Sequence, residues 1–149
     1  MRRTPIPAMA LVLLAACSGG GGGGSVTGPS MPPPGGTLSY SGTFHPVAHS
    51  GSGTAEVFVN GASMELQLAS DFATQAGPKL EVWLVAADDP SDNATVLASS
   101  HISLGALKST SGSQGYPIPA GTDLTQYRSV TVWCVAASVN FTTAPLMMH

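Results

Sequence analysis

The chain has 149 residues, of which 43% are hydrophobic and only 9% are charged, and its formal net charge is −3. Its five basic residues do not form the cluster that nucleic acid or an anionic lipid surface requires, so we exclude nucleic acid as a partner. Low charge with abundant Gly, Ser, Thr and Val is typical of an exported all-β protein.

Residues 1–16 have the order of a bacterial lipoprotein signal peptide. Arg2 and Arg3 form a positive start, and the apolar run PAMALVLLAA that follows is too short to span a bilayer as a mature helix. The run closes on Leu-Ala-Ala-Cys, which resembles the lipobox whose cysteine is diacylated on sulfur. We therefore expect Cys17 to be lipidated and to anchor the protein in the cell envelope, and Ser18 favours the outer membrane. A plain secretory peptide is the alternative.

Residues 17–36 (CSGGGGGGSVTGPSMPPPGG) show no apolar periodicity and are interpreted as a tether, flexible where Gly-rich and stiffer where Pro-rich. A coil of about 18 residues reaches on the order of 25 Å. The remaining residues 37–149 are enough for one domain with its own core. Without Arg2 and Arg3, three basic and eight acidic residues remain, a net charge of 3 − 8 = −5.

The stretch TAEVFVNGASMELQLA predicts a β-hairpin. Asn-Gly at residues 60–61 is the signature of a two-residue type I′ turn between strands of alternating polarity. This turn would set Val57 opposite Met64 on the apolar face and Glu56 opposite Glu65 on the other face. We interpret the second face as solvated.

Two later stretches, KLEVWLVAA (79–87) and SVTVWCVAA (129–137), are identical at five of nine positions. Each predicts a central strand with a purely apolar face, and each carries a tryptophan, Trp83 or Trp133, on the opposite face. The two apolar faces consist of Leu80, Val82, Leu84 and Ala86, and of Val130, Val132, Cys134 and Ala136.

Cys134 is thus expected to point into the core. A free cysteine in apolar surroundings behaves as a small hydrophobic residue and reacts slowly, so an inert role is favoured by the physics alone. Downstream, the apolar alternation changes parity, which predicts a β-bulge near residues 136–137. A bulge often lies beside a functional site, so a reactive thiol stays open as the alternative.

Two connections between the strands are interpreted as structural. The acidic segment DDPSDN (88–93) lacks the Gly and distal Glu of a calcium loop and is expected to be a solvated turn. In SGSQGY, Gln114 and Tyr116 are expected to form hydrogen bonds with buried backbone at a long connection.

The ordered segments HSGSGTAEV, GPKLEVWL, SLGALKSTSGSQGYPIP and DLTQYRSVTVWCVAASVNFTTAPL together resemble the DM-thirteen domain, also called the electron-transfer DM domain. The resemblance covers roughly residues 38–146. It implies a single antiparallel β-sandwich related to DOMON domains, with Cys134 as its characteristic cysteine and a redox or electron-transfer role proposed for that residue. DOMON relatives include haem- and sugar-binding domains.

The candidate site residues are therefore Cys134, as a redox thiol, and His49, as a helper that would activate the sulfur. The alternative for His49 is a histidine that only forms hydrogen bonds within its loop. An alternative for the aromatic residues Trp83, Trp133 and Tyr116 is that they line a ligand surface. Haem is one cofactor to consider, and copper is another because Met147, Met148 and His149 offer soft ligands at the C-terminus. The partners would be the lipid bilayer and an unidentified redox protein. The alternative is a non-catalytic envelope module that recognises a protein or glycan, with Cys134 only filling the core. No hydrolase motif occurs, and enzymatic activity is left undecided.

Overall fold

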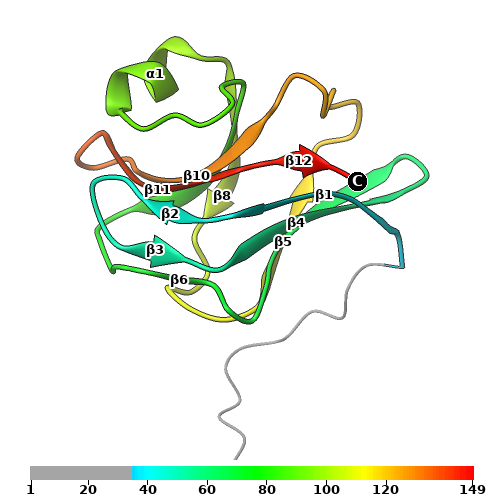
Figure 1. The fold of residues 1–149 in the computed structure, drawn as a ribbon, viewed down its shortest axis with the longest axis horizontal. Helices are drawn as coiled ribbons and strands as arrows, with labels where there is room; N and C mark the ends of the chain where they lie inside the picture. Colours follow the sequence, from blue (N-terminus) through cyan, green and yellow to red (C-terminus); the bar gives the residue numbers. More distant parts are fainter. Residues whose placement is uncertain (1–34) are drawn as a thin grey trace, which may run out of the picture.

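The computed structural model describes residues 35–149, so the predicted signal peptide, Cys17 and most of the tether lie outside the described residues. Two five-stranded antiparallel sheets pack as a sandwich, with one short helix (Figure 1). The first sheet has the order β12 (Met147–Met148), β1 (Thr37–Thr43), β4 (Thr54–Asn60), β5 (Ser63–Leu68) and β9 (Gln114–Ile118). The second has the order β2 (His45–Pro46), β11 (Val139–Pro145), β10 (Ser129–Cys134), β7 (Leu80–Val85) and β8 (His101–Ala106).

The short strands β3 (Gly51–Ser52) and β6 (Ala73–Thr74) form a small third sheet, and α1 spans Asn93–Ala98. The predicted fold class, an all-β antiparallel sandwich, is confirmed. Between residues 35 and 149, no helix has the length and apolar character needed to cross a membrane.

The core lies between the inner faces of the two five-stranded sheets. Side chains at alternate strand positions point into it, as the period of two predicts. Its members with at most 1% exposure include Val57, Leu66 and Tyr116 from the first sheet and Val82, Val132 and Cys134 from the second. The predicted inward orientation of Cys134 is therefore confirmed.

The β4–β5 hairpin is present, but its predicted register is wrong by two residues. The turn residues are Gly61 and Ala62, where Gly61 has φ +60° and Ala62 does not have a positive φ. Glycine at the first central position is the requirement of a type II′ turn, whereas type I′ needs positive φ at both positions. The observed opposed pairs are Val57 with Leu66, Glu56 with Gln67, and Phe58 with Glu65. A shift of two keeps every side chain on its predicted face.

The two similar strands β7 and β10 are neighbours at the centre of the second sheet, with Val82 opposite Val132 and Leu80 opposite Cys134. As predicted, their tryptophans lie on the other face. There Trp83 and Trp133 form a second apolar cluster with Val85 and Val96, the buried residue of α1. The outer face of this sheet thus has its own small core.

The helix α1 was not expected, since the chain was interpreted as strands throughout. Asp92, in the segment predicted to be a solvated turn, is its N-cap, and its carboxylate accepts hydrogen bonds from the backbone N–H of Thr95 at 2.7 Å and its hydroxyl at 2.9 Å. These bonds lower the pKa of Asp92 below its usual value. The turn therefore starts a helix whose Val96 covers the tryptophan side of the sheet.

The strand break after Cys134 also differs from the prediction of a bulge at residues 136–137. β10 ends at Cys134 and residues 135–138 form a turn into β11. The irregularity in pairing occurs inside β11 instead, where Asn140 and Thr142 face successive residues of β10 and leave Phe141 as the extra residue. The apolar alternation changes parity because a hairpin turn, rather than a bulge, separates β10 from β11.

The predicted role of Gln114 and Tyr116 is confirmed. The Tyr116 hydroxyl accepts from the Lys108 backbone N–H at 2.9 Å and donates to Gln114 Oε1 at 2.7 Å. Gln114 Oε1 also accepts from the Ser109 N–H at 3.0 Å, and Gln114 Nε2 donates to the Ser109 carbonyl at 2.9 Å. Burial raises the pKa of Tyr116 to about 12, which keeps the phenol neutral.

Candidate functional site

Cys134 lies at the end of β10, with 1% of its surface exposed. Its Sγ–H donates to the carbonyl oxygen of Pro78 at 3.0 Å, and the next backbone N–H, that of Val135, donates to the Lys79 carbonyl at 3.0 Å. Leu80 and Val139 are its neighbours on the adjoining strands. The thiol is held against the turn before β7 and is shielded from solvent.

His49 is held by residues other than the thiol. Its ring packs on the Phe141 ring with centroids 4.0 Å apart, and its Nδ1 lies 3.1 Å from Gln75 Oε1. Phe141 also fills the space above Gly77, where an added Cβ would come within 2.6 Å of the ring. In the part of the chain that the structure describes, His49 forms no hydrogen bond to Cys134. Its role as a helper stays a prediction.

The other histidines are dispersed. His45 Nε2 lies 2.5 Å from Asp89 Oδ1, and this hydrogen bond raises the pKa of His45 above its usual value. His149 Nε2 lies 2.5 Å from the Ser41 hydroxyl, beside the exposed Met148. No three His, Cys, Asp or Glu side chains between residues 35 and 149 are grouped as metal ligands. Copper at the C-terminal methionines and haem stay hypotheses.

An aromatic stack crosses the outer face of the second sheet. The rings of His101 and Trp83 are parallel within 1° with centroids 4.3 Å apart, and Trp83 stacks on Trp133 at 5.0 Å and 20°. Trp83 is 9% exposed and Trp133 is 2% exposed, whereas His101 faces solvent. The stack leads from the surface at β8 to the residue that precedes Cys134.

Glu81 completes this cluster. Its Oε2 accepts from Trp83 Nε1 at 2.7 Å and from the Ser103 hydroxyl at 2.8 Å. The sequence had placed both tryptophans on one face, but the stack depends on the order and register of β10, β7 and β8. His101 lies opposite Val85 in that register, one diagonal step from Trp83. Once the pairing of these strands is known, the cluster follows.

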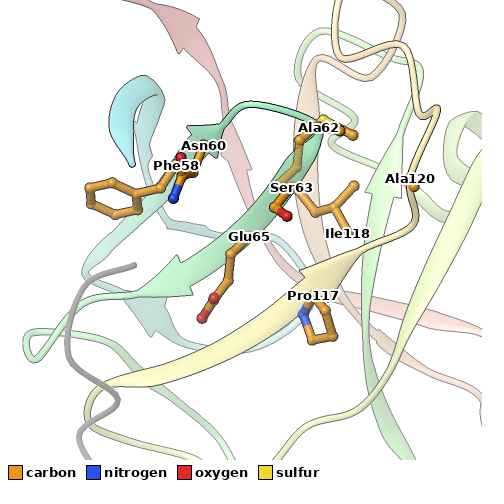
Figure 2. A pocket seen from close by; sticks show the side chains of 9 residues that line it. Phe58, Asn60, Ala62, Ser63, Glu65, Pro117, Ile118 and Ala120 are labelled. Carbon is orange, nitrogen blue, oxygen red and sulfur yellow. The ribbon is translucent and has the colours of Figure 1, made fainter. Parts of the chain in front are cut away.

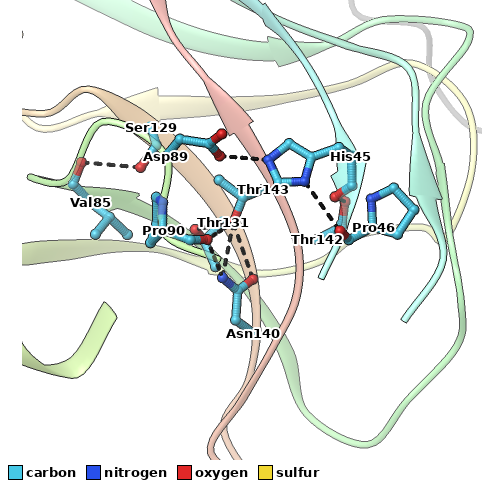
Figure 3. Close-up of polar contacts among 10 residues, drawn as sticks. All are labelled: His45, Pro46, Val85, Asp89, Pro90, Ser129, Thr131, Asn140, Thr142 and Thr143. Carbon is cyan, nitrogen blue, oxygen red and sulfur yellow. Dashed lines mark hydrogen bonds and ion pairs between the residues drawn. The ribbon is translucent and has the colours of Figure 1, made fainter. Parts of the chain in front are cut away.

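A buried polar network fixes the loop over this face (Figure 3). The Asn140 side chain donates to the Pro90 carbonyl at 3.0 Å, and its backbone N–H donates to Asn93 Oδ1 at 2.8 Å. The hydroxyls of Thr131 and Thr143 lie 3.1 Å apart beneath the same loop. Asn140 and both threonines have 0% exposure. The network holds the segment that leads into α1 against the sheet.

A hollow of about 300 Å³ lies at the far end of the β4–β5 hairpin and does not include Cys134 or His49 (Figure 2). Phe58, Glu65 and Pro117 line it from three adjacent strands. Glu65 Oε1 is buried there, and no group in residues 35–149 forms a hydrogen bond to it. The hollow is separate from the thiol and the aromatic stack.

The chain is similar to known proteins at the level of a family. The family model described as "Electron transfer DM13" matches residues 43–146, which include Cys134 and the aromatic stack but only the last residue of β1 and none of β12. No curated protein and no solved structure matches the chain. Because the matched region covers most of the chain, this protein belongs to the DM13 electron-transfer family.

Proposed function

We propose that this protein is a lipid-anchored protein of the bacterial envelope that transfers electrons through Cys134. The observation that carries the redox part is the match to an electron-transfer family over residues 43–146, in which Cys134 is the one free cysteine among the described residues. The anchoring part is supported by the lipobox-like sequence that ends in Cys17.

The burial of Cys134 limits the kind of redox chemistry. Thiol–disulfide exchange requires a second sulfur to reach Sγ, and a side chain with 1% exposure does not admit one in the folded state. A single electron needs no such access, because it can pass through the protein. One-electron transfer therefore fits the position of Cys134 better than disulfide exchange.

A redox titration tests this function. The full-length protein in detergent is equilibrated under argon with mediators of graded potential, and the electrons withdrawn per chain are counted. We expect a one-electron wave that Cys134→Ala removes. Met148→Leu is the matched control, because it removes an exposed sulfur and should leave the wave unchanged. Identical titrations of the wild type and Cys134→Ala would contradict the proposal.

The second candidate is an envelope binding module in which Cys134 only packs. The hydrogen bond from Sγ to the Pro78 carbonyl and the apolar neighbours of the thiol favour this candidate. Alkylation distinguishes the two candidates when the protein is first oxidised with mediators, then denatured, and then labelled with a small alkylating reagent. Under the redox function, prior oxidation should abolish the labelling of Cys134. Under the binding function, Cys134 should be labelled with or without prior oxidation.

Mass spectrometry and fractionation test the anchor. We expect an N-terminal peptide that begins at Cys17 and carries acyl mass, and we expect the protein in the outer-membrane fraction. Cys17→Ser should release it into the soluble fraction. An unmodified Cys17 in the mature chain would overturn the anchoring and leave the redox proposal intact.

A further inference from the structure

We propose that Trp83 is the residue from which an external one-electron metal oxidant takes an electron, and that Glu81 accepts the indole proton in the same event. The inference rests on the proposed electron-transfer function and assigns its point of exit from the protein. The oxidant meets the stack at His101, the end that faces solvent.

The first support is the geometry of the three rings. The centroids of His101, Trp83 and Trp133 follow one another at 4.3 Å and 5.0 Å, with interplanar angles of 1° and 20°. Such stacked rings place their π orbitals in contact, and the two electron-rich indoles are more easily oxidised than the imidazole. His101 Nδ1 lies 3.0 Å from the Ser99 carbonyl, which only accepts, so Nδ1 carries the proton and the ring orientation is fixed.

The second support is the hydrogen bond at the indole nitrogen. Removal of an electron makes an indole N–H strongly acidic, so a base already in place promotes the oxidation. Trp83 Nε1 donates to Glu81 Oε2 at 2.7 Å. Trp133, the other ring of the pair, has no hydrogen-bond acceptor for its indole N–H among residues 35–149. The cluster therefore selects Trp83 for proton-coupled oxidation.

The step balances with one electron and one proton. Trp83 gives one electron to the metal oxidant, its N–H bond breaks, and the proton forms an O–H bond on Glu81, which leaves a neutral indolyl radical and a neutral carboxyl. An electron from Trp133 then reduces the Trp83 radical, and Glu81 returns the proton to Trp83 Nε1. Trp133 is in turn reduced by an electron from Cys134, its neighbour in β10, and the thiol proton leaves along its hydrogen bond to the Pro78 carbonyl oxygen, from which water takes it up.

Flash photolysis tests the assignment on the full-length protein in detergent. Tris(bipyridine)ruthenium(III), generated by a light flash with an irreversible quencher, is the oxidant, and the transient absorption of the neutral indolyl radical is the readout. We expect the radical in the wild type and its loss in Trp83→Phe. In Glu81→Gln, its formation should slow about a hundredfold, because the amide oxygen still accepts the hydrogen bond but is not a base. Heavy water should slow the formation of the radical in the wild type but not in Glu81→Gln.

The matched controls are Glu56→Gln, a carboxylate on the other sheet, and Tyr127→Phe, a partly buried ring against the inner core. Both should form the radical at the wild-type rate. Wild-type kinetics in Trp83→Phe, or equal rates in Glu81→Gln and Glu56→Gln, would overturn the inference. The function of Cys134 is tested separately. If Cys134 supplies the electron that ends the radical, the radical should live longer in Cys134→Ala than in the wild type. Equal lifetimes with an intact Trp83 signal would contradict the role of Cys134 alone.

Discussion

The inner and outer faces of the second sheet use the same strands but different chemistry. The inner face is apolar at its centre, with Leu84, Val132 and Cys134 packed against the opposite sheet. The outer face combines the aromatic stack with the Asn140 network beneath the loop to α1. An apolar surface can pack in many ways, whereas rings and hydrogen bonds require particular positions. The inner face thus contributes most of the stability, and the outer face fixes the positions of the aromatic rings and of the loop to α1.

The largest loss of stability is expected on the inner face. Leu84→Ala removes a side chain with 0% exposure and leaves a cavity, so the free energy of unfolding should fall by about 3 kcal/mol. Urea denaturation measures it. Leu97→Ala, at a site with 55% exposure on α1, is the control and should change little. If Leu84→Ala lowered the free energy of unfolding by less than the outer-face variants do, the inner face would not be the main source of stability.

On the outer face, Asn140→Ala removes the donor to Pro90 and leaves buried polar groups without partners. The free energy of unfolding should fall by about 2 kcal/mol. Asn60→Ala is its matched control, because that asparagine is exposed at the end of β4. Hydrogen exchange should show the loop and α1 opening before the sheets. Uniform loosening of the whole domain would show that the network is not specific to the loop.

Cys134→Ala sharpens the comparison, since the residue belongs to the inner face but adjoins the stack. If packing alone is lost, the free energy of unfolding should fall by about 1 kcal/mol. Tryptophan fluorescence should stay unchanged, because the two indoles lie on the opposite face. A changed emission spectrum would indicate that the faces are coupled through β10.

The smallest effect is expected at His45 and Asp89, which join β2 to the loop over the outer face. The pKa of His45 is raised in the folded state from 6.5, so this pair stabilises fully below that value and loses its contribution as the pH rises through the folded pKa. Because the side chains are 38% and 51% exposed, the contribution should be under about 1 kcal/mol. The wild type should exceed Asp89→Asn in stability at about pH 5.5, and the difference should shrink at about pH 8.5. A difference that grows with pH would contradict this sign.

The sequence allowed prediction of the features that depend on alternation alone. The inward Cys134 and the outward tryptophans follow from a period of two, whereas the sandwich was implied by the family resemblance. The turn at Gly61 was placed one residue early because Asn-Gly is the commoner turn signal, and only the φ angles decide between the two turns. The error left every side chain on its predicted face of the sheet, because it shifted the register by two residues, an even number.

The features missed depend on contacts between distant segments. α1 has six residues, too few for a periodic signal, and its N-cap Asp92 was interpreted as part of a turn. The Asn140 network joins residues far apart in the sequence, such as Asn140 and Pro90, which are 50 positions apart. His101 had no partner in the sequence, because its stacking on Trp83 requires β8 beside β7. The network and the stack depend on strand order, which alternation does not specify.

The outermost strands of the sandwich bear on the behaviour of many copies held close together. β12 and β2 have only two residues each, and β9 contains Pro117, which lacks an N–H to offer a neighbouring chain. β8 carries Gly105 with φ +106°. Short, interrupted rims give a second copy little backbone to pair with, so crowding should not lead to fibrous assembly. Many copies of the domain can therefore be held at high density without polymerising through their strand edges.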